Sequence, residues 1–139
     1  MSSLAGVIQS IFVSIVRFIW QFLGGADELL YAFIAFICIA YVTELLCAIV
    51  EKKLSNEIGI YGIVRKLFIF LIIGAANIVD SLLGIEGIVR TITITFFMCS
   101  EGMSILENAR RVNLSVPHKL KDLLALFHNN RNSKNCDKN

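Results

Sequence analysis

Ionisable side chains within strongly apolar segments are the residues of this chain with the clearest chemical potential. Glu44, Asp80 and Glu101 each interrupt an apolar run, and Glu107 follows Glu101 closely. A carboxylate is costly in lipid, so it normally faces a protein partner or water, and several of them could form a proton relay. Glu101 follows the apolar run 92–98, so it could instead mark a helix end that lipid headgroups solvate. The residue types leave both interpretations of Glu101 open.

Enzymatic chemistry has no matching pattern in the sequence. It contains no nucleophile paired with a base, no phosphate-binding glycine loop and no cluster with metal-ligand spacing. The cysteines show no CxxC spacing, and Cys38, Cys47 and Cys99 lie in apolar runs, where Cys behaves as a small hydrophobe. We therefore expect no enzyme activity, no cofactor and no metal ion, and a membrane enzyme ranks last among the functions considered.

The composition predicts a membrane protein. The chain has 139 residues, 56% of them hydrophobic, and a soluble domain of this length has too little core to bury so many apolar side chains. Three runs, about 29–50, 67–83 and 88–106, are long and apolar enough for core transmembrane helices. The alternation of Thr and Ile over 91–95 is typical of a strand, but a lone strand cannot satisfy its backbone in lipid, so we expect a helix.

The first apolar run, 4–23, is amphipathic. Ser10, Ser14, Arg17 and Gln21 recur on one face of a helix, and the opposite face is apolar. Such a helix could lie in the membrane interface, or it could span the membrane and turn its polar stripe toward a lumen. Residues 1–25 are therefore predicted to form an N-terminal amphipathic helix or a fourth transmembrane helix.

The chain turns polar after the third core run. Apolar residues at helical spacing within 118–130 predict a short amphipathic helix after Pro117, and the Asn- and Lys-rich stretch 129–139 predicts disorder. The expected fold is an all-α integral membrane protein. It comprises the N-terminal helix 1–25, a three-helix transmembrane domain over 26–108 and a basic cytoplasmic tail over 109–139.

Basic residues are unevenly distributed and predict the topology. The polar connector 51–66 carries four of them and the segment after Asn108 carries more, whereas the turn 84–87 has none. By the positive-inside rule, the connector and the C-terminus are cytoplasmic in a multi-pass protein of the bacterial cytoplasmic membrane. Residues 58–64 of this connector are expected at the membrane surface. The topology-setting residues are Lys52, Lys53, Arg65 and Lys66.

Asp80 and Arg90 flank the turn 84–87 and so lie near the same membrane boundary. An ion pair between them is one expectation, and separate solvation of both side chains is the alternative. Small and polar residues also form a stripe along the first core span, at Ala40, Thr43, Glu44, Cys47 and Ala48. Such a stripe packs against another helix, either of the same molecule or of a second copy.

Four blocks of residues carry a resemblance to a known family. In chain order they are Lys52-Lys53-Leu54-Ser55 with Ile58-Gly59, Gly62 and Arg65-Lys66; Asp80 with Gly84; Ser100-Glu101-Gly102-Met103-Ser104-Ile105-Leu106-Glu107-Asn108; and Pro117 with Lys119-Leu120-Lys121. In this order and spacing they resemble the phage holin family that includes the clostridial toxin-secretion holins. Members typically carry Asp-Tyr-x-Thr-Gly where this chain reads Ala40-Tyr41-Val42-Thr43-Glu44. The acid has moved to the Gly position, so no role of that Asp carries over to this chain.

The resemblance implies a holin, a protein that oligomerises in the cytoplasmic membrane and forms holes that release an endolysin or a large toxin. The implied partners are the lipid bilayer, further copies of the chain and that cargo; we expect no nucleic acid. Candidate pore or helix-packing residues are Ser14, Arg17, Glu44, Asn77 and Asp80, and the motif residues Glu101, Gly102, Glu107 and Asn108 are expected to hold the packing and its cytoplasmic end. The alternative is a small ion- or proton-coupled transporter subunit, although no internal repeat supports it.

Overall fold

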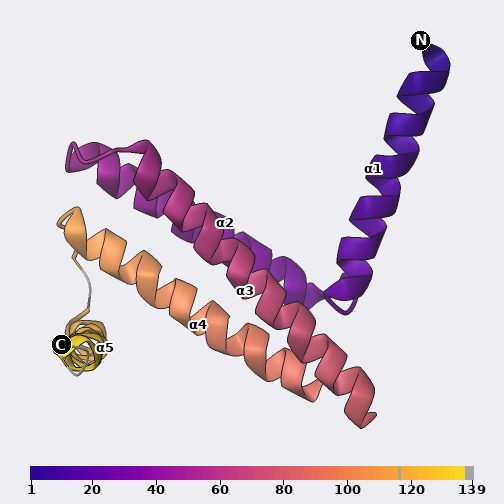
Figure 1. Ribbon diagram of the computed structural model, residues 1–139. Coiled ribbons are helices and arrows are strands. Elements are labelled where there is room, and N and C mark those ends of the chain that lie inside the picture. The colour runs from indigo at the N-terminus through magenta and orange to yellow at the C-terminus, as the bar shows by residue number, and fades with distance from the viewer. Residues whose placement is uncertain (116, 137–139) are drawn as a thin grey trace.

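Five α-helices make up the computed structural model, which describes residues 1–115 and 117–136 (Figure 1). In chain order they are α1 (Ser2–Phe22), α2 (Glu28–Val50), α3 (Asn56–Leu83), α4 (Ile88–Arg111) and α5 (His118–Cys136). The described part of the chain contains no strand, which confirms the all-α prediction. α1, α2, α4 and the Gly59–Leu83 part of α3 are each long and apolar enough to cross a membrane.

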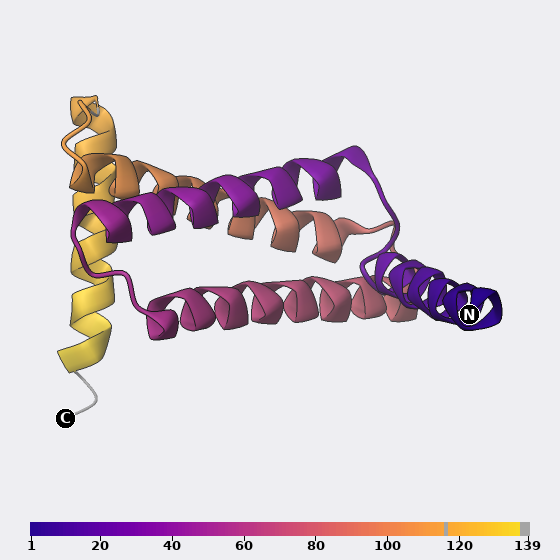
Figure 2. The same ribbon diagram turned by 90° about the horizontal axis from the view of Figure 1, so that it is seen from above.

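Helices α2, α3 and α4 lie side by side as an antiparallel bundle (Figures 1 and 2). Their shared core is built from branched and aromatic side chains at helical spacing, namely Leu30, Phe33, Ile37, Ile69, Ile73 and Ile94, with Leu23 at one end. Outside this core the helices expose further large apolar residues, such as Leu46, Leu71 and Ile92. An apolar exterior of this extent suits lipid as the surrounding solvent.

Local hydrogen bonds explain where the helices begin. Asp27 caps α2, because its Oδ1 accepts a hydrogen bond from the Leu30 N–H at 2.9 Å.

The Thr–Ile alternation in α4 is helical as predicted. There the hydroxyls of Thr93 and Thr95 donate to carbonyls four residues earlier, at 2.7 and 2.8 Å. These bonds satisfy the hydroxyls within the helix itself.

The second core helix is longer than predicted. α3 begins at Asn56, so residues 58–64 form its first turns, and their location at the membrane surface stays a prediction. These turns pack on α2: a Cβ atom added to Gly62 would lie 3.5 Å from the ring of Tyr41, and one added to Gly59 would lie 3.8 Å from its hydroxyl. Both are ordinary contact distances, so these glycines lie against the Tyr41 side chain within a continuous helix.

Two other boundaries also differ from the prediction. α4 continues to Arg111, beyond the expected end at 106, and α5 continues to Cys136. Residues 129–136 are therefore helical rather than disordered, and the rest of the predicted disordered segment, 137–139, lies outside the described residues.

The first and last helices depart from the bundle direction. α1 leaves the bundle near the start of α2 and projects away from it, touching α3 only near its own C-terminal end (Figures 1 and 2). α5 crosses the opposite end of the bundle, near the end of α4. At 1.5 Å per residue, the 23 residues of α2 separate these two crosswise helices by about 35 Å, close to the thickness of a bilayer core.

Candidate functional site: polar contacts inside the helix bundle

A buried ion pair joins α3 to α4. The Lys66 ammonium donates to Oε2 of Glu101, and the two side chains are only 12% and 1% exposed. Both residues lie inside their helices and are largely shielded from solvent. Of the two interpretations of Glu101, the structure shows the one in which the carboxylate faces a protein partner. The pair neutralises two charges that would each be costly inside an apolar bundle.

The second oxygen of that carboxylate has no partner. Oε1 of Glu101 is buried and accepts no hydrogen bond from any described residue. A buried ionic group is stabilised fully only when all of its lone pairs are satisfied. The Lys66–Glu101 contact therefore holds α3 and α4 together at a cost, and a hydrated arrangement of the same residues would remove that cost.

A neutral polar network joins α4 to α2 nearer the end of the bundle. The Asn108 side-chain amide donates to the Thr43 hydroxyl at 3.0 Å, and the Cys47 thiol donates to the Asn108 carbonyl at 3.1 Å. The Thr43 hydroxyl in turn donates to the carbonyl of Ala40 at 2.8 Å. Thr43 and Cys47 of the predicted small and polar stripe therefore contact α4 of the same molecule.

An exposed ion pair closes the same end. The Arg111 guanidinium donates to both carboxylate oxygens of Glu51, at 3.0 and 2.6 Å, and to the Asn108 side-chain oxygen at 3.4 Å. The hydrogen bonds from Arg111 lower the pKa of the Glu51 carboxyl below its ordinary value of 4.5. The pair links the ends of α2 and α4, but water screens much of its energy because Glu51 is solvated.

At the opposite end of the bundle, Arg90 is the central residue. It is only 5% exposed, and its guanidinium contacts the carboxylate of Asp27 at 2.7 and 3.1 Å and the carbonyls of Leu23 and Gly25. These acceptors all belong to the segment between α1 and α2. The hydrogen bonds from Arg90 lower the pKa of the Asp27 carboxyl below its ordinary value of 3.8.

Asp80 contacts Arg90 through the backbone and not through the guanidinium. Its carboxylate accepts the N–H groups of Val89 and Arg90 at 2.9 and 2.8 Å, and so caps the start of α4 across the turn 84–87. The expected Asp80–Arg90 side-chain ion pair is therefore wrong in its partner, because Asp27 takes the guanidinium. The short turn places the Asp80 carboxylate beside the first N–H groups of α4. These groups have no acceptor within the helix, so they attract a carboxylate.

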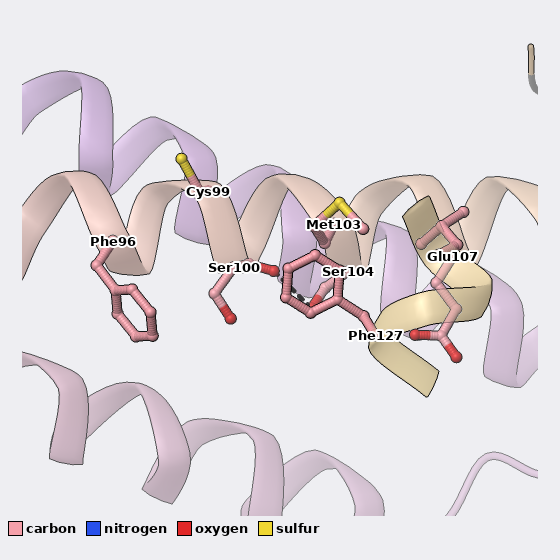
Figure 3. Close-up of a pocket in the computed structure, with 8 residues that line it drawn as sticks. Phe96, Cys99, Ser100, Met103, Ser104, Glu107 and Phe127 are labelled. Carbon is pink, nitrogen blue, oxygen red and sulfur yellow. Dashed lines mark hydrogen bonds between the residues drawn. The ribbon is translucent and has the colours of Figure 1, made fainter. Parts of the chain in front are cut away.

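The Ser100–Asn108 motif divides between two faces of α4. Glu101 and Asn108 are buried against the bundle, whereas Ser100, Ser104 and Glu107 line a cavity of about 230 Å³ beneath α5 (Figure 3). Leu124 of α5 is buried at this cavity, whose other lining residues are Phe96, Cys99, Met103 and Phe127. Gly102 lies against the Phe36 ring of α2, since a Cβ atom there would be 3.6 Å from it.

The predicted pore residues do not form one cluster. Ser14 and Arg17 are exposed on α1, away from the bundle. Glu44 is half-buried on α2 and faces Gly62 of α3. Asn77 lies at the Arg90 end, where its side-chain amide donates to the Phe22 carbonyl at 3.2 Å.

The predicted basic residues also divide into two groups. Lys52, Lys53 and Arg65 are exposed at or near the end of the bundle where α2 finishes, and Lys52 ends α2 in a left-handed conformation with φ of 55°. Lys66 instead points into the bundle as the partner of Glu101. The sequence alone does not reveal this pairing, or the one between Asp27 and Arg90. Each helix of the bundle carries more than one charged residue, and only the helix register shows which of them meet.

No group of three His, Cys, Asp or Glu side chains that could hold a metal ion occurs among the residues whose positions the structure gives. The polar residues of the bundle contact one another or the backbone, as ion pairs and hydrogen bonds between helices. What they can do chemically is stabilise one packing of the helices and become hydrated in another.

Comparison with known proteins relates the chain to phage holins. A model of the bacteriophage holin family matches residues 17–129. An uncharacterized protein of Listeria monocytogenes is 34% identical over 104 residues, which cover 75% of this chain and 74% of that protein. An uncharacterized protein of Clostridium perfringens is 34% identical over 116 residues, 82% of this chain and 86% of that protein. A probable holin of Bacillus phage phi105 is 29% identical over 83 residues, 60% of this chain and 62% of that protein. No solved structure matches significantly.

Proposed function

The chain belongs to the bacteriophage holin family, and on that premise we propose that it oligomerises in the cytoplasmic membrane and forms holes that release an endolysin or a large toxin. Family membership and four apolar helices indicate a multi-pass protein of the cytoplasmic membrane with a non-enzymatic role. The family match over residues 17–129 is the observation that carries the proposal. The transporter alternative has no comparable support.

The arrangement of charge in the bundle supports a sealed monomeric or small oligomeric state. Its exterior is apolar, and two of its cations are paired internally, Lys66 with Glu101 and Arg90 with Asp27. A molecule of this kind is stable in lipid without opening a path for water. It can therefore accumulate in the membrane while the membrane stays intact.

Hole formation requires a second packing in which the polar faces border water. Hydration of a buried ionisable group is worth roughly several kcal/mol. When many subunits share one lumen, each of them gains this hydration energy, so the rearrangement becomes favourable. In this packing Glu44, Asn77 and Asp80 line or border the lumen, and Ser14 and Arg17 border its outer mouth. The unpaired oxygen of Glu101 makes the sealed packing less than fully satisfied, which favours the switch.

The motif residues hold the cytoplasmic end of the bundle in this proposal. Glu101 hydrogen-bonds to α3 and Asn108 to α2, Gly102 lies against the Phe36 ring of α2, and Glu107 lies at the cavity beneath α5. The C-terminus and the loop between α2 and α3 are cytoplasmic, in agreement with the distribution of Lys52, Lys53 and Arg65. The domain limits of the sequence analysis, a bundle over 26–108 and a cytoplasmic tail over 109–139, follow from the same topology.

Controlled expression in a bacterial host tests the proposal. Growth and release of a cytoplasmic marker enzyme are followed after induction, with an uninduced culture as control. Normal growth for a delay, then an abrupt stop with release of the enzyme, supports hole formation. Smooth growth with full retention of the enzyme contradicts it, as does leakage restricted to ions, which would favour the transporter alternative.

A further inference from the structure

We propose that α1 lies flat in the outer interface of the membrane, where its unpartnered apolar face binds the lipid surface. The inference rests on the proposed membrane location but not on hole formation. No residue of Ser2–Phe22 is buried, so the helix has an intramolecular partner only at its end. Its apolar face exposes about half or more of each large side chain, at Ile8, Ile11, Phe12, Ile15 and Ile19. An apolar surface of this length needs a partner.

The direction of α1 is fixed by contacts at its C-terminal end. The Asn77 side chain and the Arg90 guanidinium donate to the last carbonyls of the α1 segment, those of Phe22 and Leu23. The Phe22 ring occupies the space beside Gly74 of α3, where a Cβ atom would overlap it. These contacts come from residues that are themselves held in the bundle, so α1 leaves at a set angle and crosses the bundle direction (Figures 1 and 2).

An aromatic pair marks the depth at which α1 leaves the bundle. Trp20 and Tyr31 pack together with ring centroids 5.8 Å apart, close to the Asp27 cap of α2. Trp and Tyr are enriched at the membrane–water interface, where an amphipathic ring is best solvated. The C-terminal part of α1 therefore lies at interface depth. Because the helix crosses the bundle direction, its remainder stays at that depth.

The polar stripe of α1 complements lipid headgroups. Ser10 and Ser14 donate to carbonyls within their own helix, at 2.9 and 2.8 Å, which leaves Arg17 and Gln21 as the free polar groups of this stripe. Gln9 is a further exposed polar residue of α1, outside the stripe. α1 contains one basic residue, Arg17, and no acidic one. A guanidinium among small polar residues matches the phosphate groups of anionic lipids. In a spanning helix the same Arg17 would lie about one turn deeper than Trp20 and would have to extend back toward the headgroups, because it has no partner among the described residues.

Spin-label accessibility of the full-length protein tests the proposal. The native cysteines are replaced, by Ser at Cys47 to keep its donor and by Ala elsewhere. Single labels are then placed along 7–19 of α1 in vesicles of phosphatidylethanolamine and phosphatidylglycerol. Accessibility to oxygen, which partitions into lipid, is compared with accessibility to a water-soluble nickel chelate. Exposed positions of α2, such as Ile39 and Leu46, form the matched control because the proposed function places them across the bilayer.

A flat helix predicts a helical oscillation along α1. Labels on the apolar face should be accessible to oxygen and should all report the same shallow membrane depth along the helix. Labels on the Arg17 face should be accessible to the nickel chelate. Labels along α2 should instead report a membrane depth that increases to a maximum near Ile39 and then decreases. A single central depth maximum in α1 would overturn the proposal in favour of a spanning helix. An apolar face shielded from both reagents would overturn it in favour of a second protein copy, and a flat profile for α2 would overturn the proposed membrane location as well.

A charge change gives a second, independent readout. Arg17→Glu places an anion against the anionic lipid. The labels on the apolar face of α1 should therefore report a shallower membrane depth, and the helical oscillation of their accessibility should weaken. Arg17→Lys keeps the charge and should keep the wild-type profile. Equal profiles for both variants would overturn the assignment of Arg17 to the headgroups.

Discussion

Removal of one member of the Lys66–Glu101 pair should destabilise the sealed bundle far more than removal of both. Glu101→Leu leaves the Lys66 ammonium, with a side chain only 12% exposed, without an anion between α3 and α4. Breaking a buried ion pair on one side costs about 3–5 kcal/mol. Because Lys66 keeps some exposure, we take the lower figure of about 3 kcal/mol, which corresponds to roughly a hundredfold change in the equilibrium between packed and separated helices.

The double variant Lys66→Met/Glu101→Leu should recover most of this loss. Replacement of a buried pair by apolar residues of similar volume is often neutral or stabilising, and here it also removes the unsatisfied Oε1 of Glu101. Lys66→Met alone leaves a buried carboxylate and should also destabilise. Together the four proteins form a double-mutant cycle whose coupling energy is favourable for the wild-type pair.

Stability is measured by unfolding the purified proteins in detergent and monitoring their helix content. The functional counterpart is the time at which leakage begins in induced cells. Glu86→Leu is the control, because Glu86 is exposed in the turn before α4, and it should change stability by less than about 0.5 kcal/mol. In cells the Lys66 and Glu101 single variants should release the marker enzyme earlier than wild type. Equal stability of Glu101→Leu and Glu86→Leu would refute the reasoning.

Three further predictions concern other contacts. Asn108→Leu removes an interhelical hydrogen bond and should lower the unfolding free energy by about 1 kcal/mol, measured in the same detergent assay. Gly74→Ala places a Cβ atom on the Phe22 ring and should cost about 1–3 kcal/mol, whereas Gly102→Ala, which meets only ordinary contact, should cost less. The pKa of Asp27 is lowered in the folded protein by Arg90, so its stabilising effect is present above the ordinary value of 3.8 and is lost as the pH falls through the lower folded value. Thermal unfolding should therefore show a steeper acid dependence for wild type than for Asp27→Asn as the pH falls from about 3.8 through the lower folded pKa, and parallel curves would contradict this.

Periodicity and hydropathy were sufficient to predict most of the fold. The core helices follow from apolar runs of spanning length, and the helical state of the Thr–Ile alternation in α4 follows from the need to satisfy its backbone. The sequence analysis assigned residues 51–66 to a polar connector because of their charged residues, whereas α3 begins at Asn56. This part of α3 packs against Tyr41 of α2, a neighbour that local sequence does not identify.

The candidate site was predicted less completely. The sequence identified Glu101, Asn108 and Asp80 as residues of interest, but it did not give their partners. Partner choice depends on the rotation and axial register of facing helices, which a single sequence leaves undetermined. Asp27 shows this clearly: it carries the signal of a helix cap, yet its second function is to bind Arg90, which lies far along the chain.

Release of protein-sized cargo from sealed vesicles is the most direct test of the central claim. The purified protein is reconstituted at increasing density into vesicles that contain a small dye together with a folded enzyme. Hole formation predicts that both contents escape together above a threshold density, and that Glu101→Leu lowers this threshold. Escape of the dye while the enzyme is retained, or retention of both at every density, would contradict the proposed release of an endolysin or a toxin.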